Sequence, residues 1–274
     1  MIVGIFLPKP ATKGGTCSLL FHRFRIAGFL ILMALLQFSN SYAQDYNAHI
    51  KEGDRLEAIP NEKGALHEFK EALKLQPLNL YALTKCSELC SRIGAREKEI
   101  KSRDSYFHAA LIYGKTAIKY FPENDEANVV IAIATGRLAL TKSGKEKIAT
   151  VKEIRHYAEK ALQINPSNFK AWHIIGKWNY EISNLSMFER AATKIFYGGL
   201  PQASFKASIE AYEKARALNP GFTLNYLELA KAYKKNDNRQ KAVSLLKMLL
   251  TLPVKTEDDP RIKKEAAELI KHWE

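Results

Sequence analysis

The sequence predicts an all-α solenoid built from helical hairpins, and two observations support this fold class. From Gln44 onward, apolar residues recur three and four positions apart, as on one face of a helix, and not at every second position. Four segments share an alanine followed five residues later by a proline, and these prolines lie 45, 44 and 54 residues apart. Self-similarity at such periods is typical of solenoids. The segments are ALKLQP (72–77), AIKYFP (117–122), ALQINP (161–166) and ARALNP (215–220).

The residues around the first of these prolines follow the second helix of a tetratricopeptide repeat. Ala65, Phe69, Ala72 and Pro77 are spaced by 4, 3 and 5 residues, and Gly53 lies 12 residues before Ala65. Small residues let the two helices of a hairpin approach closely, and a proline ends the second helix. The sequence therefore predicts an all-α, tetratricopeptide-like helical-hairpin solenoid.

Two later segments repeat the pattern W-x-x-L-G-x-x-Y of a first repeat helix. One contains Trp172, Ile175, Gly176 and Asn179, with asparagine in place of tyrosine; the other contains Tyr226, Leu229, Ala230 and Tyr233. We expect one domain over 44–274 with five hairpin units, about 46–79, 80–122, 125–166, 169–220 and 223–253. A last helix over 259–273 has an apolar face and is expected to cap the exposed end of the stack.

The start of each unit carries a predicted helix cap. Asn79, Asn124 and Asn168 follow the unit-ending prolines and stand where the next helix should begin. Asparagine is among the preferred N-cap residues because its side-chain oxygen accepts a hydrogen bond from the first helical turn.

The N-terminal 43 residues are predicted to be a signal peptide. Arg23 and Arg25 precede the apolar run 26–36, and Ser41-Tyr42-Ala43 fits a cleavage site with small residues. Cleavage near Ala43 predicts export to the periplasm or cell envelope. One alternative is that residues 26–36 stay as a membrane anchor, and another is that the protein is organellar. The residues before the apolar run are unusually many for a signal peptide, and a start codon assigned too far upstream would explain them.

The protein is strongly basic, with a net charge of +13. A basic surface attracts acidic proteins or anionic lipid. We expect no nucleic-acid partner, because an arginine-rich arm, a zinc-ligand spacing and an RNP-type aromatic motif are all missing from the sequence. Cys86 and Cys90 share one helix face; they are interpreted as two small buried residues, with a disulfide as the alternative.

Long segments of the second half resemble the regulator of microtubule dynamics protein family. The specific parts are WHIIGKWNY (172–180) and KIFYGGLP (194–201); NYLELAKAYKKNDNRQKAVSLLKMLLTLP (225–253) and DPRIKKEAAELIKHW (259–273) extend the resemblance. It implies an all-α tetratricopeptide-like protein that associates with other proteins. Eukaryotic members are tied to microtubules, the spindle and organelle membranes. The signal peptide would make this protein an exported, bacterial-type member, outside a cytosol that contains microtubules.

A concave groove is the first candidate binding site. Positions 2, 5, 9 and 12 of the first helix usually line the groove of such repeats, and in the C-terminal half these positions are mostly basic. We expect a basic groove that binds an acidic protein or peptide partner. The alternative is a solvated charged face without a ligand. The candidate residues are Lys170, His173, Lys177, Tyr180, Lys231 and Lys234.

A long insertion within the fourth unit is the second candidate site. If 185–200 is helical, its apolar residues form one stripe that either touches a partner or an anionic membrane, or packs back onto the stack. The surface residues proposed for this element are Phe188, Ile195, Phe196 and Tyr197.

Catalysis finds little support in the sequence. The histidines are scattered, and nucleophile, metal-protease and phosphate-loop motifs are missing. We expect no catalytic residues, no metal site and no cofactor. The predicted function is a non-enzymatic interaction scaffold; the alternatives are a lipid-binding or membrane-surface module, and a microtubule-associated regulator if the protein is cytosolic.

Overall fold

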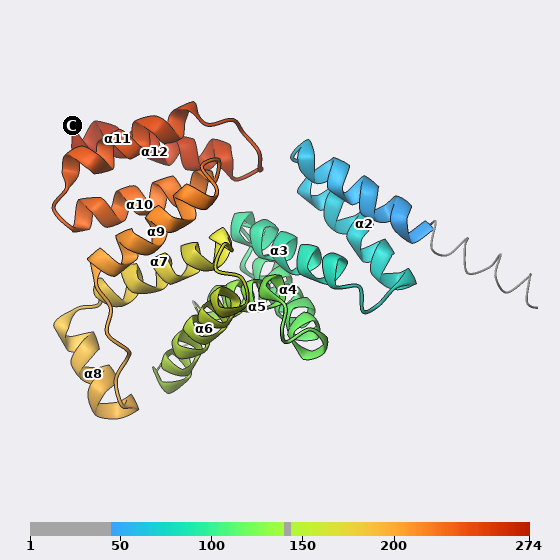
Figure 1. Ribbon diagram of the computed structural model, residues 1–274, viewed down its shortest axis with the longest axis horizontal. Helices are drawn as coiled ribbons and strands as arrows, with labels where there is room; N and C mark the ends of the chain where they lie inside the picture. The colour runs from blue at the N-terminus through green and yellow to red at the C-terminus, as the bar shows by residue number, and fades with distance from the viewer. Residues whose placement is uncertain (1–44, 140–143) are drawn as a thin grey trace, which may run out of the picture. The chain divides into compact units, whose positions relative to one another are not determined.

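The computed structural model describes residues 45–139 and 144–274 (Figure 1). The protein separates into two units, Met1–Asn47 and Ala48–Glu274, and the second unit contains the hairpins and the surfaces considered below. The predicted signal peptide 1–43 and its apolar run 26–36 lie outside the described residues. Within the described ranges, no helix combines the length and the apolar character needed to cross a membrane.

The regular structure of the described residues is entirely helical, which confirms the predicted fold class. An unlabelled helix over 45–58 comes first. The others are α2 (Glu62–Leu75), α3 (Leu80–Arg96), α4 (Ile100–Tyr120), α5 (Asp125–Ala139), α6 (Gly144–Ile164), α7 (Phe169–Ser183), α8 (Met187–Tyr197), α9 (Phe205–Leu218), α10 (Thr223–Lys235), α11 (Arg239–Thr251) and α12 (Asp259–Trp273).

These helices pack as consecutive hairpins. The hairpins pair α3 with α4, α5 with α6, α7 with α9, and α10 with α11, so α8 is inserted between the two helices of one hairpin. The predicted asparagine caps are present: the side-chain oxygens of Asn79, Asn124 and Asn168 accept hydrogen bonds from the backbone three residues on, at 3.0 Å each. Each cap satisfies a backbone donor that the helix itself leaves unpaired.

A glycine facing an aromatic ring sets the spacing within three of the hairpins. A Cβ atom added at Gly53, Gly94 or Gly176 would lie 2.8, 2.8 or 2.6 Å from the ring of Phe69, Phe107 or Tyr212, respectively. These distances are too short for any side chain. The close approach explains why small residues recur in the first helix of a unit.

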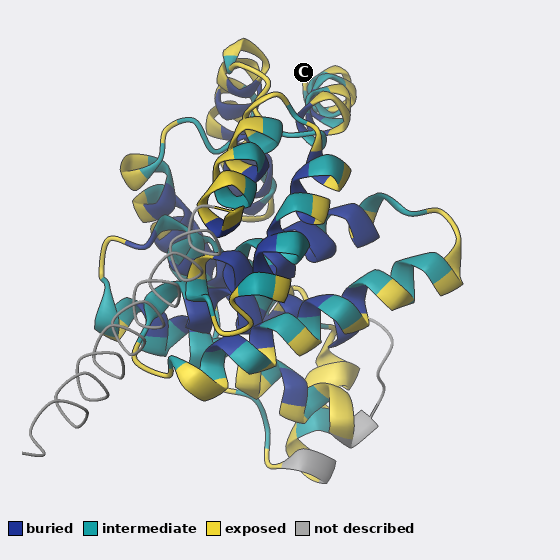
Figure 2. Ribbon diagram, turned by 90° about the vertical axis from the view of Figure 1, so that its right-hand side faces the viewer, coloured by how far each residue is buried: buried dark blue, intermediate teal, exposed yellow. Residues whose placement is uncertain are grey.

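Buried residues lie where neighbouring helices face one another, and exposed residues lie along the outer edges of the helices (Figure 2). The C-terminal core joins α9, α10, α11 and α12, with Tyr212, Leu229 and Leu246 fully buried. Ile262 and Ala266 of α12 are buried in the same core. The last helix therefore covers apolar surface of the α10–α11 hairpin, which is the role of a capping element in a solenoid.

The two cysteines of α3 are buried and carry free thiols. The interpretation as small packing residues is confirmed, and the alternative of a disulfide is not. Burial raises the pKa of the Cys90 thiol to about 11, so little reactive thiolate is present near neutral pH.

Candidate interaction surface

The first helices of successive hairpins lie side by side and share one face. Helix α5 contacts both α3 and α7, and α7 contacts α10. Past the intervening α5, Lys170 of α7 reaches Glu88 of α3, with Nζ and Oε2 2.7 Å apart. Side chains of α3, α5, α7 and α10 on this side therefore face one another. We call this side the inner face; its residues are Glu88, Arg137, Lys170, His173, Lys177, Glu228 and Lys231.

The predicted groove lysines are all engaged in ion pairs, apart from Lys234. Lys170 pairs with Glu88 and also with Glu126, at 3.1 Å. Lys177 pairs with Glu228 at 2.7 Å and with Glu181 at 2.8 Å; Lys231 pairs with Glu228 at 3.2 Å and with Glu265 at 2.8 Å. The inner face thus alternates in charge and does not present a row of free ammonium groups. Groove binding by these residues stays a prediction.

The pKa shifts agree with this pairing. Burial alone would raise the pKa of Glu88, but Lys170 and Arg92 hold it at about 2. Burial would lower the pKa of Lys177, and Glu228 outweighs it and raises the value to about 12. Opposite charges in close contact stabilise the ionised forms of both partners. These groups remain charged at neutral pH and balance one another.

His173 occupies a fixed orientation at the centre of the inner face. The Asn225 side chain donates to the Tyr212 carbonyl at 2.9 Å, so its oxygen is left to accept from Nδ1 of His173 at 3.0 Å. The imidazole also packs against the rings of Tyr212 and Phe222, with centroids 5.2 and 4.9 Å away. Burial lowers the pKa of His173, which favours the neutral ring.

Tyr180 and Lys234 are the remaining two groove candidates. Tyr180 is half-buried against Phe205, with ring centroids 5.7 Å apart, and the Lys177 ammonium lies 5.7 Å from its ring. Lys234 is half-buried in the last turn of α10. The structure thus brings Lys170, His173 and Lys177 together along α7, and Lys231 joins them through Glu228.

Arg137 belongs to the same face and was missed by sequence reasoning. It lies in the last turn of α5 and is half-buried. Its Nε atom is shielded from solvent and has no hydrogen-bond partner. Burial lowers the pKa of Arg137, the Asp258 carboxylate raises it and the Arg261 guanidinium lowers it. Arg137 is not among the six groove candidates named from the sequence, and its partners are distant in the chain, so the local pattern did not indicate it.

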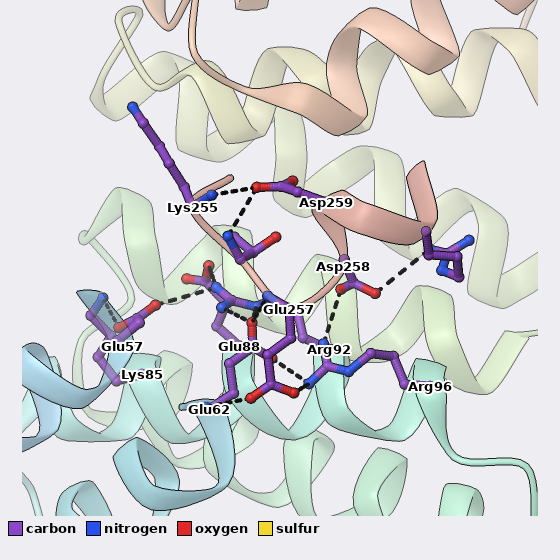
Figure 3. A network of polar contacts seen from close by, with 12 residues as sticks. Glu57, Glu62, Lys85, Glu88, Arg92, Arg96, Lys255, Glu257, Asp258 and Asp259 are labelled. Carbon is purple, nitrogen blue, oxygen red and sulfur yellow. Dashed lines mark hydrogen bonds and ion pairs between the residues drawn. The ribbon is translucent and has the colours of Figure 1, made fainter. Parts of the chain in front are cut away.

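A second cluster that sequence reasoning missed surrounds Glu62, at the N-terminus of α2 (Figure 3). This carboxylate is fully buried and lies between two arginines of α3. Arg92 donates to Oε1 through Nε at 3.0 Å, and Arg96 donates to Oε2 at 2.5 Å. Arg92 also binds Glu57 and Glu88, so the cluster continues into the inner face.

The same cluster reaches the loop between α11 and α12. The backbone N–H of Glu62 donates to the Glu257 carboxylate at 2.7 Å. Arg96 binds Glu257 at 3.0 Å and Asp258 at 3.2 Å. We call these contacts of Glu62, Arg96, Glu257 and Asp258 the clasp, because they join residues of the first hairpins to the segment before the last helix.

Helix α8 presents an apolar face that the other described residues leave uncovered. Met187, Phe188 and Ile195 are 86, 90 and 73% exposed. The helix is well formed, with a capping box in which Ser186 and Glu189 satisfy each other's backbone donors. The expectation that the stripe packs onto the stack is wrong for Phe188 and Ile195. The predicted side chains Phe196 and Tyr197 lie outside the described part of the helix.

Comparison with known proteins places this architecture in a family. The sequence model described as "Regulator of microtubule dynamics protein 1-3" matches residues 49–274. The chain belongs to this family. Regulator of microtubule dynamics protein 1 of Bos taurus is 26% identical over 226 residues, which cover 79% of this chain and 71% of the bovine protein.

A second family member and a solved structure support the same family and the same fold. Regulator of microtubule dynamics protein 3 of Xenopus laevis is 30% identical over 146 residues, 53% of this chain and 32% of the frog protein. A thermophilic tetratricopeptide-repeat protein of Thermus thermophilus superposes with a TM-score of 0.62 at 16% identity, covering 82% of this chain and 99% of its own. That structural likeness shows the tetratricopeptide-like fold.

The described residues of this family member offer little for catalysis. Across them, no three His, Cys, Asp or Glu side chains cluster closely enough to hold a metal ion. His173 is committed to Asn225, and the inner-face carboxylates are neutralised by lysines. What the inner face provides is a set of oriented polar groups.

Proposed function

We propose that this protein is a non-enzymatic interaction scaffold that binds an acidic protein segment along its inner face. Tetratricopeptide-like domains mediate protein interactions, and the fold is of that type. The observation that carries the proposal is the convergence of polar groups from four hairpins, with the Nε atom of Arg137 left without a hydrogen-bond partner among the described residues. Groups oriented before binding recognise a ligand with little loss of conformational entropy.

The paired charges of the inner face determine which interactions an acidic segment could make there. Lys170, Lys177 and Lys231 are already neutralised, so the face offers hydrogen bonds with fixed geometry in place of a diffuse positive field. Fixed polar groups favour specificity over long-range attraction. We expect binding that depends on the partner's sequence and weakens only modestly with salt.

Photo-crosslinking at matched tyrosines tests this assignment. We would replace Tyr81, which lies on the same side of α3 as Glu88 seven residues on, or Tyr180 of α7 by p-benzoylphenylalanine, and Tyr120 of α4 as the control on a second helix. Tyr81 and Tyr120 are similarly accessible, at 42 and 48% exposure. Irradiation in an extract of the source cells should give the same crosslinked protein from Tyr81 and Tyr180 and none from Tyr120. Crosslinking only from Tyr120 would refute the inner-face assignment.

A second candidate function is binding to an anionic membrane surface through α8. The exposed Met187, Phe188 and Ile195 can insert at the lipid interface while Lys194 on the same helix contacts headgroups. Co-flotation with phosphatidylserine-containing vesicles at low salt, lost in the variant Phe188→Ser, would support this function. Equal flotation of the wild-type protein and Phe188→Ser would exclude α8 as the membrane contact.

We further propose that the scaffold acts outside the cytosol, because residues 1–43 have the pattern of a cleavable signal peptide. N-terminal sequencing of the mature protein provides the test. Gln44 as first residue supports export, whereas an intact Met1 in the cytosolic fraction would favour a cytosolic role like that named for the microtubule-dynamics relatives.

A further inference from the structure

Arg137 stands apart from the other arginines of the described residues. Each of the others has a hydrogen-bond or ion-pair partner: Arg92 and Arg96 in the cluster around Glu62, and the rest with carboxylates or carbonyl oxygens. The Arg137 guanidinium has none within those residues, and its Nε atom is also shielded from water. A desolvated cation without a hydrogen-bonded counter-ion is costly, because it loses hydration and the more distant Asp258 carboxylate offsets only part of that loss.

The charged groups around Arg137 indicate which class of ligand would offset the free-energy cost of burying its guanidinium. Asp258 and Arg261 are close enough to act on its charge with opposite signs, and Arg261 opposes the stabilising effect of Asp258. Arg137 in turn lowers the pKa of His173, so the inner-face centre already feels its positive charge. The Asp258 carboxylate that acts on Arg137 disfavours a doubly charged phosphate at the same place. A single carboxylate supplies one negative charge and matches the guanidinium fork.

We propose that Arg137 is the receptor for one carboxylate group of an acidic peptide bound on the inner face. The carboxylate, from a glutamate or aspartate side group or from the C-terminus of the peptide, accepts two parallel hydrogen bonds from the guanidinium. This inference rests on the proposed scaffold function and specifies its partner chemistry. It also adds α5, which holds none of the groove candidates named from the sequence, to the elements that contact the ligand.

Nitrogen-15 NMR of arginine side chains tests the proposal on the full-length wild-type protein. The probes are hexaglutamate peptide, hexaglutamine peptide and inorganic phosphate, each titrated separately. The Nε–H signal of Arg137 is identified by its absence in Arg137→Lys. We expect a saturable shift of this signal with hexaglutamate, no shift with hexaglutamine, and at most a weak one with phosphate. A phosphate shift without a hexaglutamate shift overturns the carboxylate assignment and favours a lipid or phosphate ligand.

Substitution by lysine tests whether the guanidinium group itself is required, or only its positive charge. Arg137→Lys keeps the charge and loses the fork geometry, so hexaglutamate binding by fluorescence anisotropy should weaken about tenfold or more. Arg239→Lys is the control, because Arg239 is bound to the Trp273 carbonyl oxygen in α12. Equal affinity of wild type and both variants overturns the proposal.

The crosslinking experiment above distinguishes failure of the carboxylate receptor from failure of the scaffold function. One outcome is that the crosslinks from Tyr81 and Tyr180 persist in Arg137→Lys while hexaglutamate leaves the wild-type Arg137 signal unchanged. That combination supports the scaffold function and contradicts the proposal that Arg137 binds a carboxylate. If the inner-face crosslinks are missing from the wild-type protein as well, the proposed function itself is wrong.

Discussion

At the scale of single residues, Gly176 sets how closely α7 and α9 approach. A Cβ at this position would lie 2.6 Å from the Tyr212 ring, and Tyr212 is fully buried in the C-terminal core. Since the ring cannot move without displacing that core, we expect Gly176→Ala to lower the free energy of unfolding by about 1–3 kcal/mol. Urea denaturation followed by far-ultraviolet circular dichroism measures this loss.

Gly136 of α5 is the matched control, because it is another helical glycine with a different environment. A Cβ there would meet only the end of Ile154, at 3.7 Å, which is an ordinary contact. Alanine is favoured over glycine in a helix by about 1 kcal/mol, so Gly136→Ala should be neutral or stabilising. A similar loss of stability in both variants would show that the Tyr212 contact is not the cause.

His173 predicts a pH dependence of stability. Burial holds its pKa below 6.5 in the folded protein, so the unfolded protein binds more protons as the pH falls below about 6.5. Its contribution to stability is complete above that pH and decreases toward the lower folded pKa, with a slope of at most about 1.4 kcal/mol per pH unit. In His173→Gln, urea denaturation between pH 7 and 5 should show a shallower decline. An unchanged decline would assign the effect to other groups.

At the scale of elements, α8 is a helix whose apolar face contributes little to folding. Met187 and Phe188 are almost fully exposed, so the double variant Met187→Ser/Phe188→Ser should change the unfolding free energy by less than about 0.5 kcal/mol. Phe107→Ser is the contrasting variant: this ring is 3% exposed, packs against Gly94, and should cost about 3–5 kcal/mol. Thermal melts measure both. A large loss in the double variant would mean that α8 packs against the stack in solution.

At the scale of the whole molecule, the clasp should make a large contribution to stability. Glu62 is a fully buried carboxylate between Arg92 and Arg96, and removing its charge leaves two arginines undercompensated. We expect Glu62→Gln to cost about 3–5 kcal/mol. The control Glu52→Gln breaks a solvent-exposed pair with Arg55 and should leave the free energy of unfolding almost unchanged. Urea unfolding is the appropriate measurement because it adds no salt; equal losses would contradict the clasp.

The parts of the structure that were predictable from sequence are the local ones. Pro77, Gly53 and Asn79 act on neighbouring turns, so their spacing alone indicates where helices pair and begin. The long-range polar contacts were not predictable in this way, because the ion-paired Lys177 and Glu228 are 51 residues apart, and the Glu62 backbone N–H donates to a carboxylate 195 residues away. Exposure of Phe188 also escaped prediction, because an amphipathic pattern gives the apolar face of a helix and not what covers it.

The distance in sequence between Glu62 and Glu257 has a consequence for biosynthesis. A ribosome releases the first hairpins long before residue 257 is made, and each hairpin can fold on its predecessor as it emerges. At that stage the backbone N–H of Glu62 and the Nη1 atom of Arg96 lack the partners that Glu257 and Asp258 later provide. The clasp can therefore close only after residues 257 and 258 have left the ribosome, so it is among the last contacts to form during biosynthesis.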